Sequence, residues 1–509
     1  MAKRASGVRL SELLVALSLA TDLGFGQPAE HMARAARIAL RIGERLGLDA
    51  ADLATLYDVA ILTYVGCPTY GNEAATVFGD DIDFRADALR IDLAGMPARR
   101  FMMSRADGVK QKLTLMATNG RGVVEQMASH CAAAGELATR LGLNDDVRAG
   151  VQQAYARWDG KGVPADLEGA ALSLGARIAH IAEACEVFSR TDGVDGAVAM
   201  VKARQGTHFD PQLTQTVVVD PDALFKGIDE DTVDEVLDAE PVARPPLADE
   251  QLDDALATIG DFCDLRHPCF TGHSRGVAEL VAAACDALHV PAAEARVARR
   301  AASVHDVGRF GVPAQIWTKP GPLTSHEQER MRMHAYYVER IFSRPEPLRR
   351  VGLLAGTHHE RTDGSGYHRG TSGALLSVPA RVLAAADAFH AMTQPRPYRP
   401  ARTPEDAAAE LRRDARDGRL DPAAVDAVLA AAGQTTSRAR SGGPAGLTAR
   451  EADVLALLTK GMANKAIARE LSISPKTVGN HIERIYTKLG VSNRAAAAMR
   501  AMQYGLVQA

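Results

Sequence analysis

Aromatic residues and cysteines are scarce in this 509-residue chain, and long apolar runs do not occur in it. Phe, Trp and Tyr make up 5% of the residues, while Ala and Leu are abundant. This composition favours helices over β-sheets. The six cysteines are scattered without a Cys-x-x-Cys pair, which argues against a disulfide framework or a zinc ribbon. No run approaches the roughly 18 to 20 apolar residues that span a bilayer. We therefore expect an all-α cytoplasmic protein that does not bind membranes.

The charge is unevenly distributed along the chain. The net charge is −4, yet residues 447–509 hold nine Lys or Arg and only four Asp or Glu. On charge alone, a solvated surface is the commoner explanation of such a segment, and a nucleic acid as partner is the alternative. The length is that of about three domains.

Histidines are concentrated between His267 and His390, a stretch that holds ten of the fifteen in the chain. A single histidine on an apolar helix is usually a core residue, but candidates on several separate segments need another explanation. Imidazole and carboxylate ligands together suit iron, manganese or zinc, and Asp306 lies where it can bridge two such ions. The seven candidate ligands are His273, His305, Asp306, His334, His358, His359 and Asp387.

Further motifs accompany these ligands in a fixed order, namely Lys319 to Leu323, Asp363 to Tyr367 and Arg396 to Arg399. With them, residues 251–431 resemble the HD-GYP domain, a helical family of metal-dependent phosphohydrolases whose best-known substrate is cyclic di-GMP. The resemblance implies two divalent transition-metal ions held by the seven ligands. It also implies that Asp306 and Arg309 are catalytic, and that the substrate contacts are Arg309, Lys319, Gly366, Tyr367 and Arg396.

Three positions depart from the family pattern. The signature Gly-Tyr-Pro reads Gly366-Tyr367-His368, and Arg309 replaces a lysine that contacts the substrate phosphate in the family. Cys269 stands where some members place a glutamate that holds a third metal. We therefore expect two metal ions rather than three, and a phosphorylated ligand for which a cyclic dinucleotide is one candidate.

Residues 1–227 repeat this domain in degenerate form. Shifted by 242 residues, His31 lies over the first histidine ligand and Thr63-Tyr64 over the His-Asp doublet. With a shift of 204, His130 lies over His334 and Ala154-Tyr155 over the His-His pair. The change of shift requires about 38 extra residues between Tyr64 and His130. Without the bridging aspartate, we expect no catalytic metal in this repeat.

Two connecting segments separate the predicted domains. Residues 228–250 are acidic and contain prolines, which favours an interdomain linker. Residues 432–446 are small, polar and rich in glycine, and they cannot bury a core. The second linker is therefore expected to be flexible.

The last predicted domain, residues 447–509, contains four short helical patterns. Ser474 followed by Pro475 predicts the start of a basic amphipathic helix, whose polar side is either a solvated face or a surface for the major groove. This segment resembles the LuxR-type helix-turn-helix domain in three stretches, Leu447 to Glu451, Asn464 to Ala468 and Ser474 to Val478. The resemblance implies that the DNA contacts are Asn464, Lys465, Lys476, Thr477, Asn480, His481, Arg484 and Lys488.

Together these observations predict a transcriptional regulator with two HD-GYP-like repeats, which binds double-stranded DNA as a homodimer. The second repeat would hold the metal pair and either sense or hydrolyse a phosphorylated, nucleotide-like ligand. The alternative is a phosphodiesterase whose DNA-binding domain is accessory.

Overall fold

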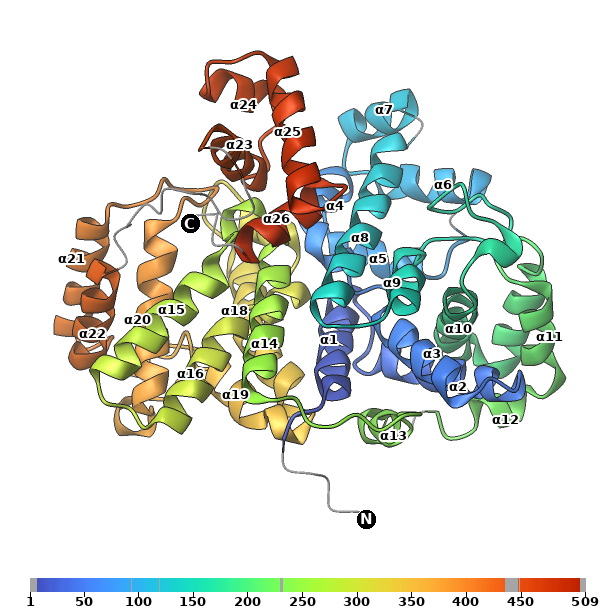
Figure 1. The fold of residues 1–509 in the computed structure, drawn as a ribbon, viewed down its shortest axis with the longest axis horizontal. Helices are drawn as coiled ribbons and strands as arrows, with labels where there is room; N and C mark the ends of the chain where they lie inside the picture. The colour runs from blue at the N-terminus through green and yellow to red at the C-terminus, as the bar shows by residue number, and fades with distance from the viewer. Residues whose placement is uncertain are drawn as a thin grey trace. The chain divides into compact units, whose positions relative to one another are not determined.

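The computed structural model describes residues 7–92, 94–118, 120–228, 232–434, 447 and 449–503. These residues form helices joined by loops and short 3-10 turns, and they contain no named strand, only isolated bridges (Figure 1). The all-α prediction is therefore confirmed. Most of the predicted linker 432–446 lies outside the described residues, as do Thr448 and the stretch from Tyr504 onward.

The helices pack into two compact units. One comprises Met1–Asp249 with Pro313–Gln315 and Arg344–Pro347, and the other comprises Glu250–Val312, Ile316–Ser343 and Leu348–Ala509.

In the first half of the chain, α2, α3 and α10 pack against one another. Helix α1 is buried on nearly all sides, including its polar residues Glu12 and Asp22. The helices of this half are α1 (Leu10–Gly24), α2 (His31–Arg45), α3 (Ala50–Leu62), α4 (Gly71–Phe78), α5 (Asp81–Ala88), α6 (Gly95–Arg105), α7 (Val109–Thr118), α8 (Arg121–Arg140), α9 (Asp145–Gln152), α10 (Leu174–Ala203), α11 (Pro211–Val219), α12 (Pro221–Phe225) and α13 (Thr232–Asp238).

In the second half, α15, α16, α20 and α22 enclose an apolar core. Val277, Val281, Val382 and Val428 are fully buried in it. The helices from residue 249 to residue 434 are α14 (Asp249–Asp264), α15 (His273–Ala287), α16 (Ala292–Val304), α17 (Ala314–Thr318), α18 (Ser325–Ser343), α19 (Arg349–Ala355), α20 (Val378–Thr393), α21 (Pro404–Arg416) and α22 (Pro422–Gln434).

The internal repeat is visible in the helix boundaries. Helices α2 and α15 begin 242 residues apart, as do α3 and α16, whereas α8 and α18 begin 204 residues apart, as do α10 and α20. Between α3 and α8 the first half forms the helices α4 to α7, whereas between the equivalent α16 and α18 the second half forms one α-helix, α17. The insertion predicted from the change of shift is therefore a small group of helices.

The two repeats also share a close backbone approach. A Cβ added to Gly308 would lie 2.0 Å from the His334 carbonyl oxygen, and one added to Gly66 would lie 2.1 Å from that of His130. In both repeats only glycine lets the turn come so close to the helix that carries the histidine, α8 in the first repeat and α18 in the second. This approach sets the distance between the turn and that histidine.

One stretch, Ala50–Thr69, is long and apolar enough to cross a bilayer, with a mean hydropathy of 1.3. It comprises α3 and the turn that follows, and 67% of its most apolar window is buried inside the protein. A core helix has these properties as well.

The C-terminal segment forms four helices: α23 (Ala449–Thr459), α24 (Asn464–Glu470), α25 (Pro475–Leu489) and α26 (Arg494–Gln503). The Ser474 side chain caps α25 by accepting a hydrogen bond from the Thr477 amide, and Pro475 follows at the first helical position. Gly490 ends the helix with a φ of 66°, a conformation that glycine adopts at little cost. Val478, Ile485 and Leu489 face the small core.

Candidate metal centre and DNA-binding surface

Five segments bring the seven predicted ligands together. His273 is the first residue of α15, His334 lies in α18 and Asp387 in α20, while the His358-His359 pair follows α19. His305 and Asp306 lie where α16 ends at Val304 and the chain tightens into the 3-10 turn Val307–Gly311. This tightening lets two consecutive side chains reach one site.

Asp306 lies between two groups of histidines. Its Oδ2 atom is 3.4 Å from Nε2 of His273 and 3.2 Å from Nε2 of His305. Its Oδ1 atom is 3.8 Å from Nε2 of both His334 and His358. Each carboxylate oxygen thus faces one histidine group, as a bridging ligand would.

Asp387 and His359 complete the cluster. Oδ1 of Asp387 lies 3.1 Å from Nε2 of His273, and Oδ2 lies 3.6 Å from Nδ1 of His359. The nearest ligand atoms of His334, His358 and His359 lie within 4.8 Å of one another, and so do those of His273, His305 and Asp306. The donor set contains only imidazole and carboxylate groups, which fits iron, manganese or zinc. The nearby thiol of Cys263 instead donates to the Asp306 carbonyl.

Backbone carbonyls fix the orientation of three ligand rings. The Nδ1 atoms of His305, His334 and His358 lie 2.7, 2.5 and 2.7 Å from the carbonyl oxygens three residues earlier. Such contacts hold the hydrogen on Nδ1 and leave the Nε2 lone pair for a metal. All three Nε2 atoms point into the cluster.

His390 was not among the predicted ligands, yet it belongs to this arrangement. Its Nδ1 atom lies 2.9 Å from Nδ1 of His273, so it orients that ring from behind. The signal in the sequence is its position one turn after Asp387 on α20.

Burial and charge set the protonation of the ligands in the metal-free protein. Burial lowers the pKa of His273 and His334 to about 4 and that of His358 to about 3, which keeps these rings neutral and able to ligate. Burial also acts on His305, but Asp306 and Asp387 raise its pKa to about 10. Although burial opposes ionisation of Asp306, Arg309 and His305 hold the pKa of this carboxyl well below its usual range.

Arg309 lies directly on the candidate bridging ligand. Its Nη2 atom is 2.5 Å from Oδ2 of Asp306, and the guanidinium lies over the Phe270 ring at 4.0 Å. The guanidinium of Arg396 also lies over the Phe270 ring, at 4.9 Å, and it donates a hydrogen bond to the Cys269 carbonyl. Arg309 and Arg396, two of the predicted substrate contacts, therefore both pack on the Phe270 ring beside the candidate metal centre.

The other predicted substrate residues have different surroundings. Lys319 pairs with Glu327 at 2.6 Å and is partly exposed. Gly366 has no room for a side chain, since a Cβ would lie 2.5 Å from the backbone of residues 359–361. Tyr367 packs its ring against His359, with 4.7 Å between centroids. The charge of Lys319, a predicted substrate contact, is thus paired with Glu327 rather than directed at the metal centre.

His368, which stands at the position of the proline in the Gly-Tyr-Pro signature, also lies outside the ligand cluster. Nε2 of His368 is 3.2 Å from Glu339. Cys269, at the position of a third-metal ligand, contacts Nδ1 of His267 at 2.9 Å instead.

The equivalent region of the first repeat is filled by apolar and phenolic side chains. Phe25, Met32, Tyr64 and Cys67 form a buried cluster, and the Tyr155 hydroxyl lies 2.8 Å from Sγ of Cys67. His31 remains, but its Nδ1 atom lies 2.5 Å from Glu186, which also binds Arg34. This histidine therefore belongs to a buried ion-pair network.

The polar side of α25 forms a candidate DNA-binding surface. Lys476, Asn480 and Arg484 are exposed on it, as are Asn464 and Lys465 at the start of α24. Three predicted contacts are placed differently. The Thr477 hydroxyl lies 2.8 Å from that of the capping Ser474, and Nδ1 of His481 is buried. Lys488 pairs with the buried Glu451 at 2.6 Å, a contact inside the domain that the prediction did not include.

Comparison with known proteins gives two family matches. Residues 123–213 and 258–424 match the family described as HD domain, and residues 445–501 match bacterial regulatory proteins of the luxR family. A 3′3′-cGAMP-specific phosphodiesterase of Vibrio cholerae is 30% identical over 426 residues, which cover 81% of this chain and 92% of that protein. A cyclic di-GMP phosphodiesterase of Thermotoga maritima is 41% identical over 132 residues, 25% of this chain and 35% of that protein. The crystal structure of a cyclic GMP-AMP-specific phosphodiesterase of V. cholerae matches 83% of this chain and 97% of its own, at 26% identity and a TM-score of 0.58.

A helical fold that gathers histidines and aspartates around one shared carboxylate is that of the HD-type metal-dependent phosphohydrolases. The chain belongs to the HD domain family and is homologous to its cyclic dinucleotide phosphodiesterases, with a LuxR-type domain at its C-terminus.

Proposed function

We propose that this protein is a cytoplasmic DNA-binding regulator whose second HD domain holds two divalent transition-metal ions and hydrolyses a cyclic dinucleotide. The observation that carries the proposal is the position of Asp306, whose two oxygens each face a different histidine group. The relatives named above, a 3′3′-cGAMP-specific phosphodiesterase and a cyclic di-GMP phosphodiesterase, support this class of substrate.

The residues of the chain would divide the work of hydrolysis. The seven ligands hold the ions, which supply a water nucleophile at neutral pH and stabilise negative charge on a phosphoryl group. Arg309 provides a permanent positive charge beside Asp306, where it can donate to a phosphate oxygen. In the reaction the water oxygen bonds to phosphorus, one P–O ester bond breaks, and the leaving oxygen takes up a proton.

Metal analysis combined with turnover tests this proposal. The purified chain should carry close to two transition-metal ions and cleave 3′3′-cGAMP or cyclic di-GMP. Asp306→Ala should lose both ions and all turnover. His31→Gln is the matched control, because it changes the equivalent histidine of the first repeat and should keep both ions. Two ions retained in Asp306→Ala would exclude a bridging role for this residue.

A second candidate is a sensor that binds its ligand without turnover, and the replacement of the usual lysine and proline by Arg309 and His368 favours it. Under this reading the metal-loaded chain binds a cyclic dinucleotide, but a single-turnover experiment with excess protein yields no linear product. Arg309→Lys should then create or increase turnover.

The C-terminal domain would bind double-stranded DNA as part of a homodimer. The exposed polar side of α25 supports this proposal, because a helix that follows a short turn can enter the major groove. A chain that ends before residue 447 should lose DNA binding and keep its metal.

A further inference from the structure

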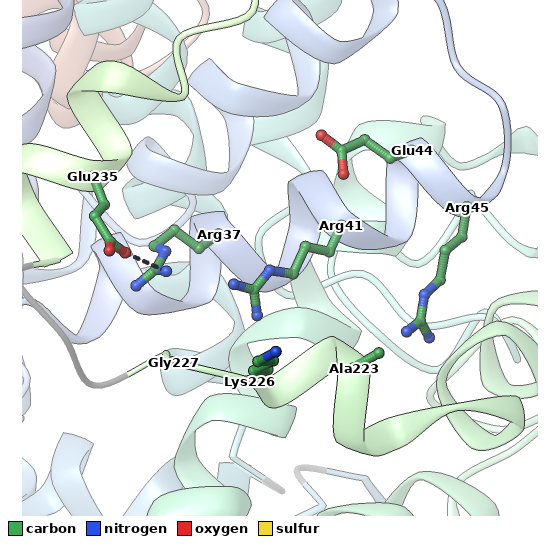
Figure 2. A pocket seen from close by; sticks show the side chains of 8 residues that line it. All are labelled: Arg37, Arg41, Glu44, Arg45, Ala223, Lys226, Gly227 and Glu235. Atoms are coloured by element: carbon green, nitrogen blue, oxygen red, sulfur yellow. Dashed lines mark ion pairs between the residues drawn. The ribbon is translucent and has the colours of Figure 1, made fainter.

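The first repeat carries a stripe of arginines on α2 that its metal-binding counterpart lacks. Arg37, Arg41 and Arg45 are spaced four residues apart, so they lie on one face of the helix. They line an open pocket of about 640 Å³ together with Lys226, Glu44 and Glu235 (Figure 2). Figure 2 shows Arg41 and Arg45 directed towards the segment that carries Lys226, whereas Glu44 points away from it.

The fold does not require this stripe. Helices α2 and α15 begin at equivalent histidines, and each follows a residue with a φ between 70° and 80°. With the shift of 242 residues, the three arginines correspond to Glu279, Ala283 and Ala287 of α15. The second repeat therefore builds the same helix with an acidic residue and two alanines on this face.

Backbone contacts hold the guanidinium groups in place. Arg41 donates to the Leu224 carbonyl at 2.7 Å, and Arg45 donates to the Asp220 carbonyl at 2.8 Å. A guanidinium carries five N–H donors in a rigid plane, so one such bond fixes its orientation and leaves donors for another acceptor. Fixed donors of this kind suit a phosphate group, which accepts two parallel hydrogen bonds from arginine.

The pocket keeps an excess of positive charge. Among the residues that the structure describes, its lining holds four cationic side chains and two acidic ones. Arg37 is already paired with Glu235, and Arg45 lies 3.8 Å from the Asp220 carboxylate. The pKa of Arg41 is lowered, first by burial and then by the neighbouring Arg37. The cations are thus close enough to repel one another, and an anion between Arg41 and Lys226 would relieve this repulsion.

We infer that this pocket is a binding site for a phosphorylated small molecule of about the size of a nucleotide, separate from the metal centre. Its volume lies in the range of small-molecule sites, about 300 to 1,000 Å³. We assign it binding rather than catalysis, because the described residues of its lining include no group that could hold a metal ion. The two acidic residues of the lining favour a compact ligand over a continuous nucleic-acid backbone.

The test uses the full chain with Asp306→Ala, so that the metal centre does not bind the probe. The probes are 5′-GMP and inorganic phosphate, with uncharged guanosine for comparison, measured by calorimetric titration. Adding Arg41→Gln and Lys226→Gln together should weaken 5′-GMP binding by about 10- to 100-fold, the loss expected when charge-assisted hydrogen bonds are removed. The matched control is Arg148→Gln, which removes a partly exposed arginine of α9 that pairs with Asp145 and should leave the affinity unchanged.

Lys226→Glu serves as a second variant. It is needed because Arg41 also donates a hydrogen bond to the Leu224 carbonyl, so that replacing Arg41 can lower the stability of the protein. Reversal of this exposed charge should weaken 5′-GMP and phosphate binding while the melting temperature stays the same. Equal affinity in the parent and both pocket variants would overturn the proposal. So would the absence of binding by both anionic probes at about 10 mM, or guanosine binding as tightly as 5′-GMP.

Discussion

Gly308 is the position at which a single methyl group should uncouple the two halves of the metal centre. A Cβ at this residue would lie 2.0 Å from the His334 carbonyl oxygen and 2.8 Å from the Val338 amide nitrogen. Both neighbours are backbone atoms of α18, which cannot rotate out of the way. To reach the 3.0 Å limit of real Cβ contacts, α18 must move away by about 1 Å.

This displacement is large compared with the tolerance of a metal site. Ligand distances in such sites hold within about 0.2 Å of their ordinary values, and His334 moves with α18. Gly308→Ala should therefore weaken binding at the group of His334, His358 and His359, and the metal content should fall from two ions towards one. The strain of overpacking costs about 1 to 3 kcal/mol, which lowers the melting temperature of a repeat of this size by roughly 2 to 12 °C.

The assay is metal analysis of the folded protein, together with thermal melting and turnover. Gly66→Ala is a matched control, because its Cβ would meet the His130 carbonyl at 2.1 Å in the repeat whose centre is filled by tyrosines. It should cost similar stability and leave both ions bound. If Gly308→Ala keeps two ions and full turnover, or if both variants lose metal alike, the link between this close approach and the metal centre is wrong.

Three further predictions concern the rest of the chain. Lys476→Ala should weaken binding to all DNA sequences and reduce the slope of log K against log salt concentration by about 0.9. Asn480→Ala should instead cost about 1 to 3 kcal/mol of discrimination at one base pair. Both effects are measured by DNA titration at several salt concentrations. Glu183 is a buried residue of α10 whose Oε1 atom lies 3.7 Å from Nε2 of His31. Burial raises the pKa of Glu183 to about 7 from 4.5, so its contribution to stability is lost as the pH rises from about 4.5 to 7. Glu183→Gln should accordingly gain up to about 3 kcal/mol relative to wild type between pH 4.5 and pH 8 in melting experiments; an equal difference at both pH values would refute this. If the HD centre controls DNA binding, saturating operator DNA must change the affinity for a non-hydrolysable cyclic dinucleotide by the same factor by which that ligand changes DNA affinity.

Patterns that depend on backbone geometry were predictable from the sequence. The scarcity of aromatic residues together with the abundance of Ala and Leu indicated an all-α fold. The change of shift from 242 to 204 residues located the insertion that forms α4 to α7. The candidate ligands were recognisable because they lie on five separate segments of the chain in a fixed order. These features depend on local spacing, which the sequence records directly.

Contacts between distant side chains were not predictable in the same way. His390 faces His273 from a helix that starts more than a hundred residues later, and no spacing rule pairs the two. Lys488 looked like one more cation on the polar side of α25, but its long stem reaches Glu451 of α23. Arg309 was expected to face a substrate, and the geometry places its charge on Asp306 as well. Each case depends on the direction of a flexible side chain, which packing decides.

The contrast between the repeats explains why a retained histidine says little about metal binding. In the first repeat, burial raises the pKa of Tyr64 well above its ordinary value, so the side chain at the position of Asp306 is neutral and needs no counter-ion. His31 and Arg34 are both partners of the buried Glu186 carboxylate. Loss of His31 would leave this carboxylate with one partner fewer, which is a costly change. The second repeat buries Asp306 among rings whose Nε2 atoms face it, an arrangement that metal cations would stabilise. The central carboxylate of Asp306, rather than the number of histidines, therefore distinguishes the second repeat from the first as the candidate metal site.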